Sequence, residues 1–151
     1  MFWKIVSGGQ TGVDRAALDF ALANGIEHGG WCPKGRRAED GTLGEVYNLA
    51  ETPWKDYRQR TEWNVRDSDG TLIIYNRELS GGTQYTLEVT RKLNKPVMVV
   101  ERGGHGKAKE VLDWLEKNDV QVLNVAGPRS STEPEIYAMA MDFLEAVYLL
   151  R

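Results

Sequence analysis

Short apolar runs alternate along the chain with segments whose apolar residues recur at helical spacing. The apolar runs predict buried strands over residues 2–6, 71–75, 96–100 and 121–125. The segments at helical spacing predict helices over residues 12–24, 56–66, 83–93, 106–118 and 133–149. Strands that alternate with helices are typical of a parallel sheet covered by helices on both faces. The pattern therefore predicts an α/β fold with a doubly wound, mostly parallel sheet.

Residues 29–52 interrupt this alternation, because they follow neither a helical nor a strand pattern. Glycine and proline residues are spread through the segment, among the basic side chains of Lys34, Arg36 and Arg37. A loop of this length in a compact domain is usually functional or mobile. We expect Lys34 to contact a phosphorylated ligand from this loop, and a solvated loop is the other interpretation.

The length of 151 residues fits one domain spanning residues 1–151. The chain has no internal repeat, linker or low-complexity tract. Its formal net charge of -3, from 19 basic and 22 acidic residues, creates no long-range field that would gather nucleic acid. We therefore expect no nucleic-acid partner, and any recognition of phosphate must be local.

Metal-ligating and disulfide-forming residues are scarce. Cys32 is the single cysteine, and His28 and His105 are too far apart in sequence to suggest a zinc-binding cluster, so no metal site is predicted. One cysteine forms no intrachain disulfide, which favours a reducing, cytoplasmic setting. The sequence also has no apolar stretch long enough to span a bilayer and no apolar signal core near its start, so we expect no membrane association.

Three predicted strand-to-helix junctions combine glycine with hydroxyl side chains. They are SGGQTG at 7–12, SGGT at 80–83 and AGPRSS at 126–131. Glycine lets a ligand approach the backbone closely, and the N-terminus of a helix favours an anion. Ligands of a doubly wound sheet bind beyond the carboxyl ends of its strands. We therefore expect the three junctions to converge and to form a phosphate or oxoanion site, with tight turns that bind nothing as the alternative.

Neither common nucleotide fingerprint occurs at these junctions. A Walker sequence needs Gly-x-x-x-x-Gly-Lys followed by Ser or Thr, and a dinucleotide-binding turn needs Gly-x-Gly-x-x-Gly. The sequence therefore disfavours ATP hydrolysis and NAD binding.

The candidate ligand-binding residues come from the three junctions and from basic positions near them. Arg15 lies in the first turn of its helix, where a cation opposes the helix dipole unless an anion is bound. Asp14, in the same turn, is favoured by the dipole, and we interpret it as structural. The residues predicted to bind ligand or phosphate are Gly8, Gly9, Gln10, Thr11, Gly12, Arg15, Lys34, Gly81, Gly82, Thr83, Thr86, Gly127, Arg129 and Ser130.

Three stretches together resemble a known family: SGGQTGVDRAALD at 7–19, GGWCPKGRRAEDG at 29–41 and NVAGPRSS at 124–131. The likeness covers nearly the whole chain and is to the putative molybdenum carrier proteins, which are circularly permuted relatives of the broad Smf/DprA–LOG superfamily. The resemblance implies a Rossmann-like domain that binds a nucleotide-derived or phosphorylated ligand. It also implies the molybdenum cofactor or molybdate as candidate cargo.

A more distant resemblance is to the Lonely Guy-type phosphoribohydrolases, which cleave the N-glycosidic bond of nucleoside monophosphates. Arg60 precedes Asp69 at the spacing of that family, and the glycine pair at 81–82 precedes Glu88 at the family's spacing. The Gly-Thr of the family's loop is replaced at 84–85 by Gln and Tyr. The resemblance implies Arg60 and Glu88 as catalytic residues. An exposed arginine and a solvated helix carboxylate are the alternatives.

Two functions from different classes follow. The first is binding of a nucleotide-derived or phosphorylated ligand at the glycine-rich junctions, and the alternative is a nucleoside 5′-monophosphate phosphoribohydrolase that uses Arg60 and Glu88. A DNA-processing or regulatory module fits the superfamily but not the charge balance. The resemblance favours a homodimer or higher homo-oligomer, and so do the apolar residues of the last helix, which are Tyr137, Met141, Leu144, Val147 and Tyr148.

Overall fold

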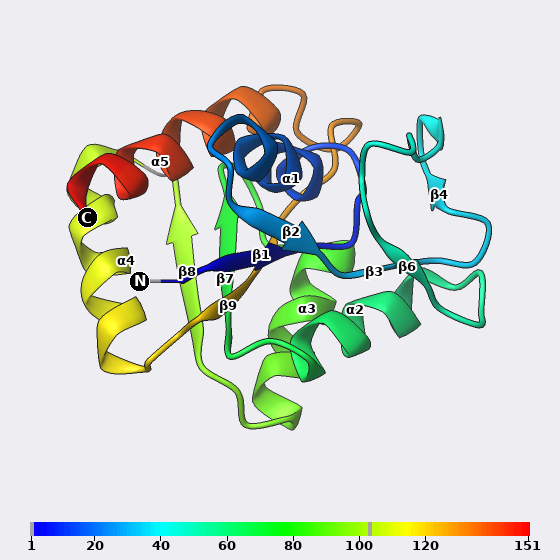
Figure 1. The fold of residues 1–151 in the computed structure, drawn as a ribbon, viewed down its shortest axis with the longest axis horizontal. Helices are drawn as coiled ribbons and strands as arrows, with labels where there is room; N and C mark the ends of the chain where they lie inside the picture. Colours follow the sequence, from blue (N-terminus) through cyan, green and yellow to red (C-terminus); the bar gives the residue numbers. More distant parts are fainter. Residues whose placement is uncertain (1, 103) are drawn as a thin grey trace.

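The computed structural model describes residues 2–102 and 104–151 (Figure 1). In this part of the chain, five parallel strands form the main sheet in the order β2-β1-β9-β7-β8. Their bounds are Lys4–Val6 (β1), Glu27–Gly29 (β2), Gly70–Tyr75 (β7), Val97–Glu101 (β8) and Val122–Ala126 (β9). The helices of the described chain are Val13–Ala23 (α1), Tyr57–Arg66 (α2), Gly81–Lys92 (α3), His105–Lys117 (α4) and Ile136–Leu150 (α5). Two small strand pairs join Trp31–Cys32 (β3) to Ala50–Glu51 (β6) and Arg37–Ala38 (β4) to Gly41–Thr42 (β5).

The main sheet lies between two layers of helices (Figure 1). On one face α5 packs against both α1 and α4, and on the other α2 packs against α3. Side chains of β7 alternate between the layers: Leu72 and Ile74 join the core that includes α1, α4 and α5, whereas Ile73 points to the opposite face. All three are fully buried because both faces are covered. The predicted α/β fold with a doubly wound parallel sheet is confirmed.

The edge strand β2 was not predicted from the sequence. It lies parallel to β1, with Ile5 opposite His28. Its sequence is Glu-His-Gly, which contains no apolar run. An edge strand pairs on one side only, and this short one is held by its backbone ladder rather than by a row of buried side chains. The hydrophobic pattern therefore gives no signal for it.

The region predicted as a long irregular loop over 29–52 is packed onto α1. Leu43 and Leu49 form a small apolar cluster with Cys32 and with Leu18 of α1. The guanidinium of Arg36 donates to backbone carbonyl oxygens of the same region, those of Leu43, Gly44, Tyr47 and Leu49. This basic side chain therefore holds the region closed instead of facing a ligand.

Part of the apolar surface of α5 is covered by the chain itself. Leu144 and Val147, on which the expected oligomer partly depended, are each 2% exposed and lie in the core with α1 and α4. They offer no free surface to a partner, and the oligomeric state stays a prediction. No helix in the described part of the chain has the length and apolar character needed to cross a membrane.

Candidate functional site

A cleft of about 360 Å³ opens where the segments that follow β1, β7 and β9 meet one side of α2. The three glycine-rich junctions thus come together, as expected for the carboxyl ends of parallel strands. The predicted residues that line this cleft are Gly8, Gln10, Arg60, Gly81, Gly82, Thr83, Thr86, Gly127 and Arg129. The other predicted residues lie outside its lining: Gly9, Thr11, Gly12, Arg15, Lys34, Glu88 and Ser130.

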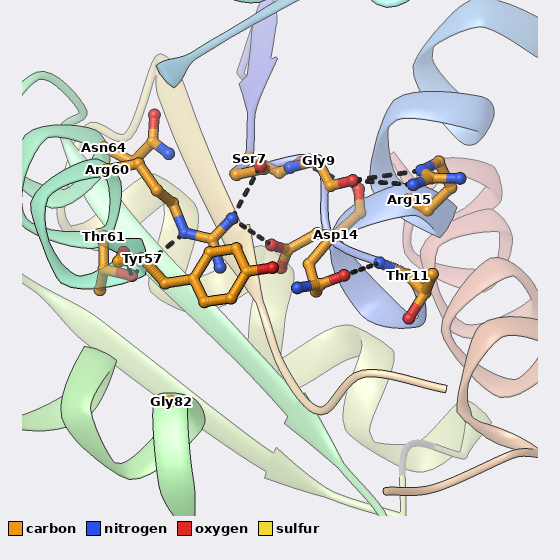
Figure 2. A network of polar contacts seen from close by, with 12 residues as sticks. Ser7, Gly9, Thr11, Asp14, Arg15, Tyr57, Arg60, Thr61, Asn64 and Gly82 are labelled. Atoms are coloured by element: carbon orange, nitrogen blue, oxygen red, sulfur yellow. Dashed lines mark hydrogen bonds and ion pairs between the residues drawn. The ribbon is translucent and has the colours of Figure 1, made fainter. Parts of the chain in front are cut away.

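Arg60 reaches from α2 to the first junction (Figure 2). Its Nη1 donates to the carbonyl oxygen of Gly8 at 2.8 Å, and its Nε lies 3.3 Å from the hydroxyl oxygen of Thr61. A Cβ at Gly8 would lie 2.4 Å from this Nη1, so glycine is needed for the close approach. Within the described chain the Nη2 of Arg60 makes no hydrogen bond, which leaves its N–H groups for a ligand.

Asp14 lies beside Arg60 in the same cleft, although its position in the sequence predicted only a structural role. Its Oδ2 is 3.9 Å from Nη1 of Arg60, and the residue is 6% exposed. Burial raises its pKa to about 6, although the charge of Arg60, the backbone N–H of Gln10, the charge of Arg15 and the backbone N–H of Gly8 oppose the rise. Its partner comes from a distant helix, so sequence position alone could not place Asp14 in the site.

The charges around the cleft are strongly unequal. Among its lining residues, Asp14 is the single acid, and the bases are Arg58, Arg60 and Arg129. The guanidinium carbons of Arg60 and Arg129 lie 5.2 and 6.0 Å from the ring centroid of Tyr57. That of Arg37, from β4, lies 5.2 Å from the same centroid. Like charges gathered around one ring repel one another, and a bound anion would relieve that repulsion.

The N-terminus of α3 forms the open side of the cleft. A Cβ at Gly81 or Gly82 would meet nothing within 4 Å, and the side chain of Ser80 makes no capping hydrogen bond. The first N–H groups of the helix are therefore accessible to an anion. Thr86 also lines the cleft, but its hydroxyl donates to the carbonyl oxygen of Gly82 at 2.9 Å.

Three glycines of the first and third junctions are in close packing contact with other parts of the chain. A Cβ at Gly12 would lie 2.2 Å from the carbonyl oxygen of Pro128, and one at Gly127 would lie 2.2 Å from that of Ile74. Gly9, with a φ of +77°, faces the side chains of Leu43 and Leu49. These positions join the junctions to each other and to the neighbouring strands; of the three glycines, Gly127 lines the cleft, whereas Gly9 and Gly12 do not.

A buried carboxylate shapes the segment between β7 and α3. Glu133 is 1% exposed and accepts the backbone N–H groups of Asn76, Arg77 and Glu78. The predicted last helix was expected to include residue 133, but α5 begins at Ile136. Glu133 therefore fixes the approach to the N-terminus of α3 from outside any helix, a role that its sequence position does not indicate.

Two basic residues that were predicted to contact the ligand, Arg15 and Lys34, lie outside the lining of the cleft. The guanidinium of Arg15 donates to the carbonyl oxygen of Gly9 at 3.2 and 3.1 Å and to both carboxylate oxygens of Asp40 at 3.0 Å. The anion that its position suggested is thus Asp40, from the chain itself. Lys34 is exposed, and its backbone N–H donates to the carbonyl oxygen of Trp54. The side chains of Arg15 and Lys34 do not line the cleft.

Glu88, the predicted catalytic carboxylate, also lies outside the lining of the cleft. The buried side chains on its helix include Leu87 and Val89, which leaves Glu88 exposed, with Nε2 of Gln84 3.5 Å from its Oε1. Helix geometry turns it away from the cleft that Arg60 lines. The arginine and the carboxylate that the hydrolase alternative requires are therefore not brought together.

In residues 2–102 and 104–151, no group of three His, Cys, Asp or Glu side chains is placed to hold a metal ion. The side chain of His105 lies outside the described residues. Cys32 is buried, and burial raises the pKa of its thiol, so it is protonated and unreactive at neutral pH.

Comparison with known proteins agrees with this fold. A solved structure titled as a "Putative molybdenum carrier protein" from Syntrophus aciditrophicus SB is similar, with a TM-score of 0.95 and 48% sequence identity. The similarity covers 97% of this chain and 94% of that one. Among the curated proteins none matches. The profile of the circularly permutated YpsA SLOG family matches residues 5–148. The chain therefore belongs to the circularly permutated YpsA SLOG family.

Proposed function

We propose that the chain binds a small anionic ligand, phosphorylated or nucleotide-derived, in the cleft between α2 and α3, and that it holds the ligand without cleaving it. One observation carries this proposal. Two arginines, Arg60 and Arg129, and the open N-terminus of α3 face one cleft in which Asp14 is the single acid among the lining residues.

The donors of this cleft suit an oxoanion. A guanidinium offers N–H groups in a planar fork that matches phosphate, and such charge-assisted hydrogen bonds are roughly twice as strong as neutral ones. The helix N-terminus adds a partial positive charge and unpaired N–H groups. Tyr57 and Tyr85, which also line the cleft, offer aromatic surface for the planar part of a nucleotide-derived ligand.

The carrier role is favoured over hydrolysis by the position of the acids. Glu88 is exposed on α3 and does not line the cleft. Asp14 is the single acid among the described residues that line the cleft, whereas cleavage of a glycosidic bond typically uses a pair of carboxylates. The name of the solved relative supports molybdate, or a phosphorylated molybdenum-containing cofactor, as the cargo.

Native mass spectrometry of freshly purified protein tests this function. We expect an adduct that contains phosphorus or molybdenum, or its return when phosphate, molybdate or AMP is added. Arg129→Ala should lose the adduct, whereas Arg66→Ala should keep it, because Arg66 pairs with Asp67 outside the cleft. An adduct that persists in Arg129→Ala would contradict the site. Wild-type protein that binds none of the three probes would contradict the function.

A further inference from the structure

A second set of anion-binding groups adjoins the cleft and is filled by the protein itself. We call it the Ser131 cradle: the hydroxyl of Thr11, the backbone N–H and hydroxyl of Ser131, and the guanidinium of Arg129. The carboxylate of Glu39 lies in it. Its Oε1 accepts the Ser131 hydroxyl at 2.5 Å, and its Oε2 accepts the Ser131 N–H at 3.2 Å and the hydroxyl of Thr11.

These donors hold the carboxylate in its charged form. Partial burial alone would raise the pKa of Glu39, but hydrogen bonds from Ser131 and Thr11 and the charge of Arg129 hold it below its usual range. The nearest nitrogen of Arg129 is 4.0 Å from Oε1. The cradle is thus a built set of donors matched to two oxygens of an anion.

The cradle does not depend on Glu39 for its shape. Its donors belong to the first and third junctions, which are joined directly: the N–H of Val13 donates to the carbonyl oxygen of Pro128 at 3.2 Å, and the N–H of Ser130 donates to Oγ1 of Thr11 at 3.0 Å. The chain beside Glu39 is also held separately, because Asp40 pairs with Arg15. The Glu39 side chain can therefore leave the cradle without unfolding either part.

Two residues connect the cradle to the cleft. Arg129 lines the cleft and reaches toward Glu39. Gln10 also lines the cleft, and its Oε1 accepts the backbone N–H of Glu39 at 2.8 Å. A ligand in the cleft that carries a second negative group could extend that group past Arg129 into the cradle.

We propose that the Ser131 cradle is a second anion subsite, closed by Glu39 in the free protein, which takes the second charged group of a diphosphate-type ligand. This inference rests on the proposed function, because the first charged group must lie in the cleft. The incoming group replaces one anion by another on the same donors, and Glu39 moves into solvent. A ligand with a single anionic group fills the cleft and leaves Glu39 in place.

The test compares inorganic phosphate with inorganic pyrophosphate, titrated calorimetrically against wild type and Glu39→Ala. Emptying the cradle removes the competing carboxylate, so pyrophosphate should bind about tenfold more tightly to the variant, the scale of one charge-assisted hydrogen bond. Phosphate should bind both proteins within about twofold, since its single group remains in the cleft. Adding Ser131→Ala to Glu39→Ala should remove most of the gain for pyrophosphate.

Glu51→Ala is the matched control. Glu51 is another carboxylate of the same region, and its Oε1 accepts the backbone N–H of Gly35 at 2.7 Å. If loosening of residues 29–52 were enough to raise the affinity for pyrophosphate, Glu51→Ala would also bind pyrophosphate more tightly. That result would overturn the inference. An equal gain for both probes in Glu39→Ala, or no gain for either, would also overturn it while leaving the cleft intact as a site. Failure of wild type to bind either probe would overturn the proposed function together with the inference.

Discussion

Arg60 and Asp14 face each other at the cleft from α2 and α1, with Nη1 of the arginine 3.9 Å from Oδ2 of the aspartate (Figure 2). The separation is longer than a direct hydrogen bond, and Nη1 donates instead to the carbonyl oxygen of Gly8. The arginine is therefore held by the backbone, while the carboxylate stays buried next to it at a cost in solvation. This arrangement links the charge of Asp14 to both stability and ligand binding.

Replacing Asp14 by Asn should make the protein more stable at neutral pH. The pKa of Asp14 rises from 3.8 to about 6 on folding. The folded state therefore binds more protons than the unfolded state between these values, and the contribution of Asp14 to stability falls as the pH rises, by about 3 kcal/mol in all. The free energy of unfolding of Asp14→Asn relative to wild type should thus increase between about pH 4 and about pH 7. Urea unfolding measures this difference, and a flat difference would contradict the raised pKa.

The affinity for an anion should also depend on the ionisation of Asp14. Ionised Asp14 repels an anion, so phosphate should bind wild type more weakly as the pH rises through about 6. Asp14→Asn should lack that step, once the ionisation of phosphate itself is accounted for by comparing the two proteins at each pH. Calorimetric titration across this range measures it. Parallel curves for the two proteins would show that Asp14 does not sense the ligand.

Two glycines of the cleft should respond differently to alanine. Gly8→Ala places a methyl group against the Arg60 side chain, so both stability and anion binding should fall. Gly82→Ala places one in open space in the first turn of α3, so stability should hold or rise slightly. Its anion binding should nevertheless weaken, because the methyl group obstructs the helix N-terminus. Thermal unfolding and phosphate titration check both variants; unchanged binding in Gly82→Ala would move the anion away from α3.

Glu133→Gln should destabilise the protein by about 1–3 kcal/mol, because a buried carboxylate that accepts several backbone N–H groups loses its charge. The neighbouring Glu135→Gln is the control. Glu135 pairs with the exposed side chain of Arg77, so little change is expected. Equal effects in urea unfolding would show that Glu133 does not hold the segment before α3.

The sequence was sufficient to predict the central strands and the helices, because the spacing of apolar residues along the chain reflects which side chains are buried. It gave no signal for β2, whose polar residues are held by backbone pairing at the sheet edge. Spacing placed Glu88 on a helix, but the direction of its side chain depends on which neighbours the sheet buries, here Leu87 and Val89. Asp14 was missed for a similar reason, since its function depends on Arg60, which only the folded chain brings beside it.

The binding of phosphate or AMP to wild type, Arg129→Ala and Arg66→Ala, measured by isothermal titration calorimetry at one pH and salt concentration, tests the anion-binding cleft most directly. Arg129 lines the cleft, and Arg66 lies on α2 outside its lining, paired with Asp67. Loss of Arg129 should weaken binding by about 1.5–3 kcal/mol, about ten- to a hundredfold, whereas loss of Arg66 should leave it unchanged. Equal affinities for all three proteins, or equal losses in both variants, would contradict an anion site in this cleft.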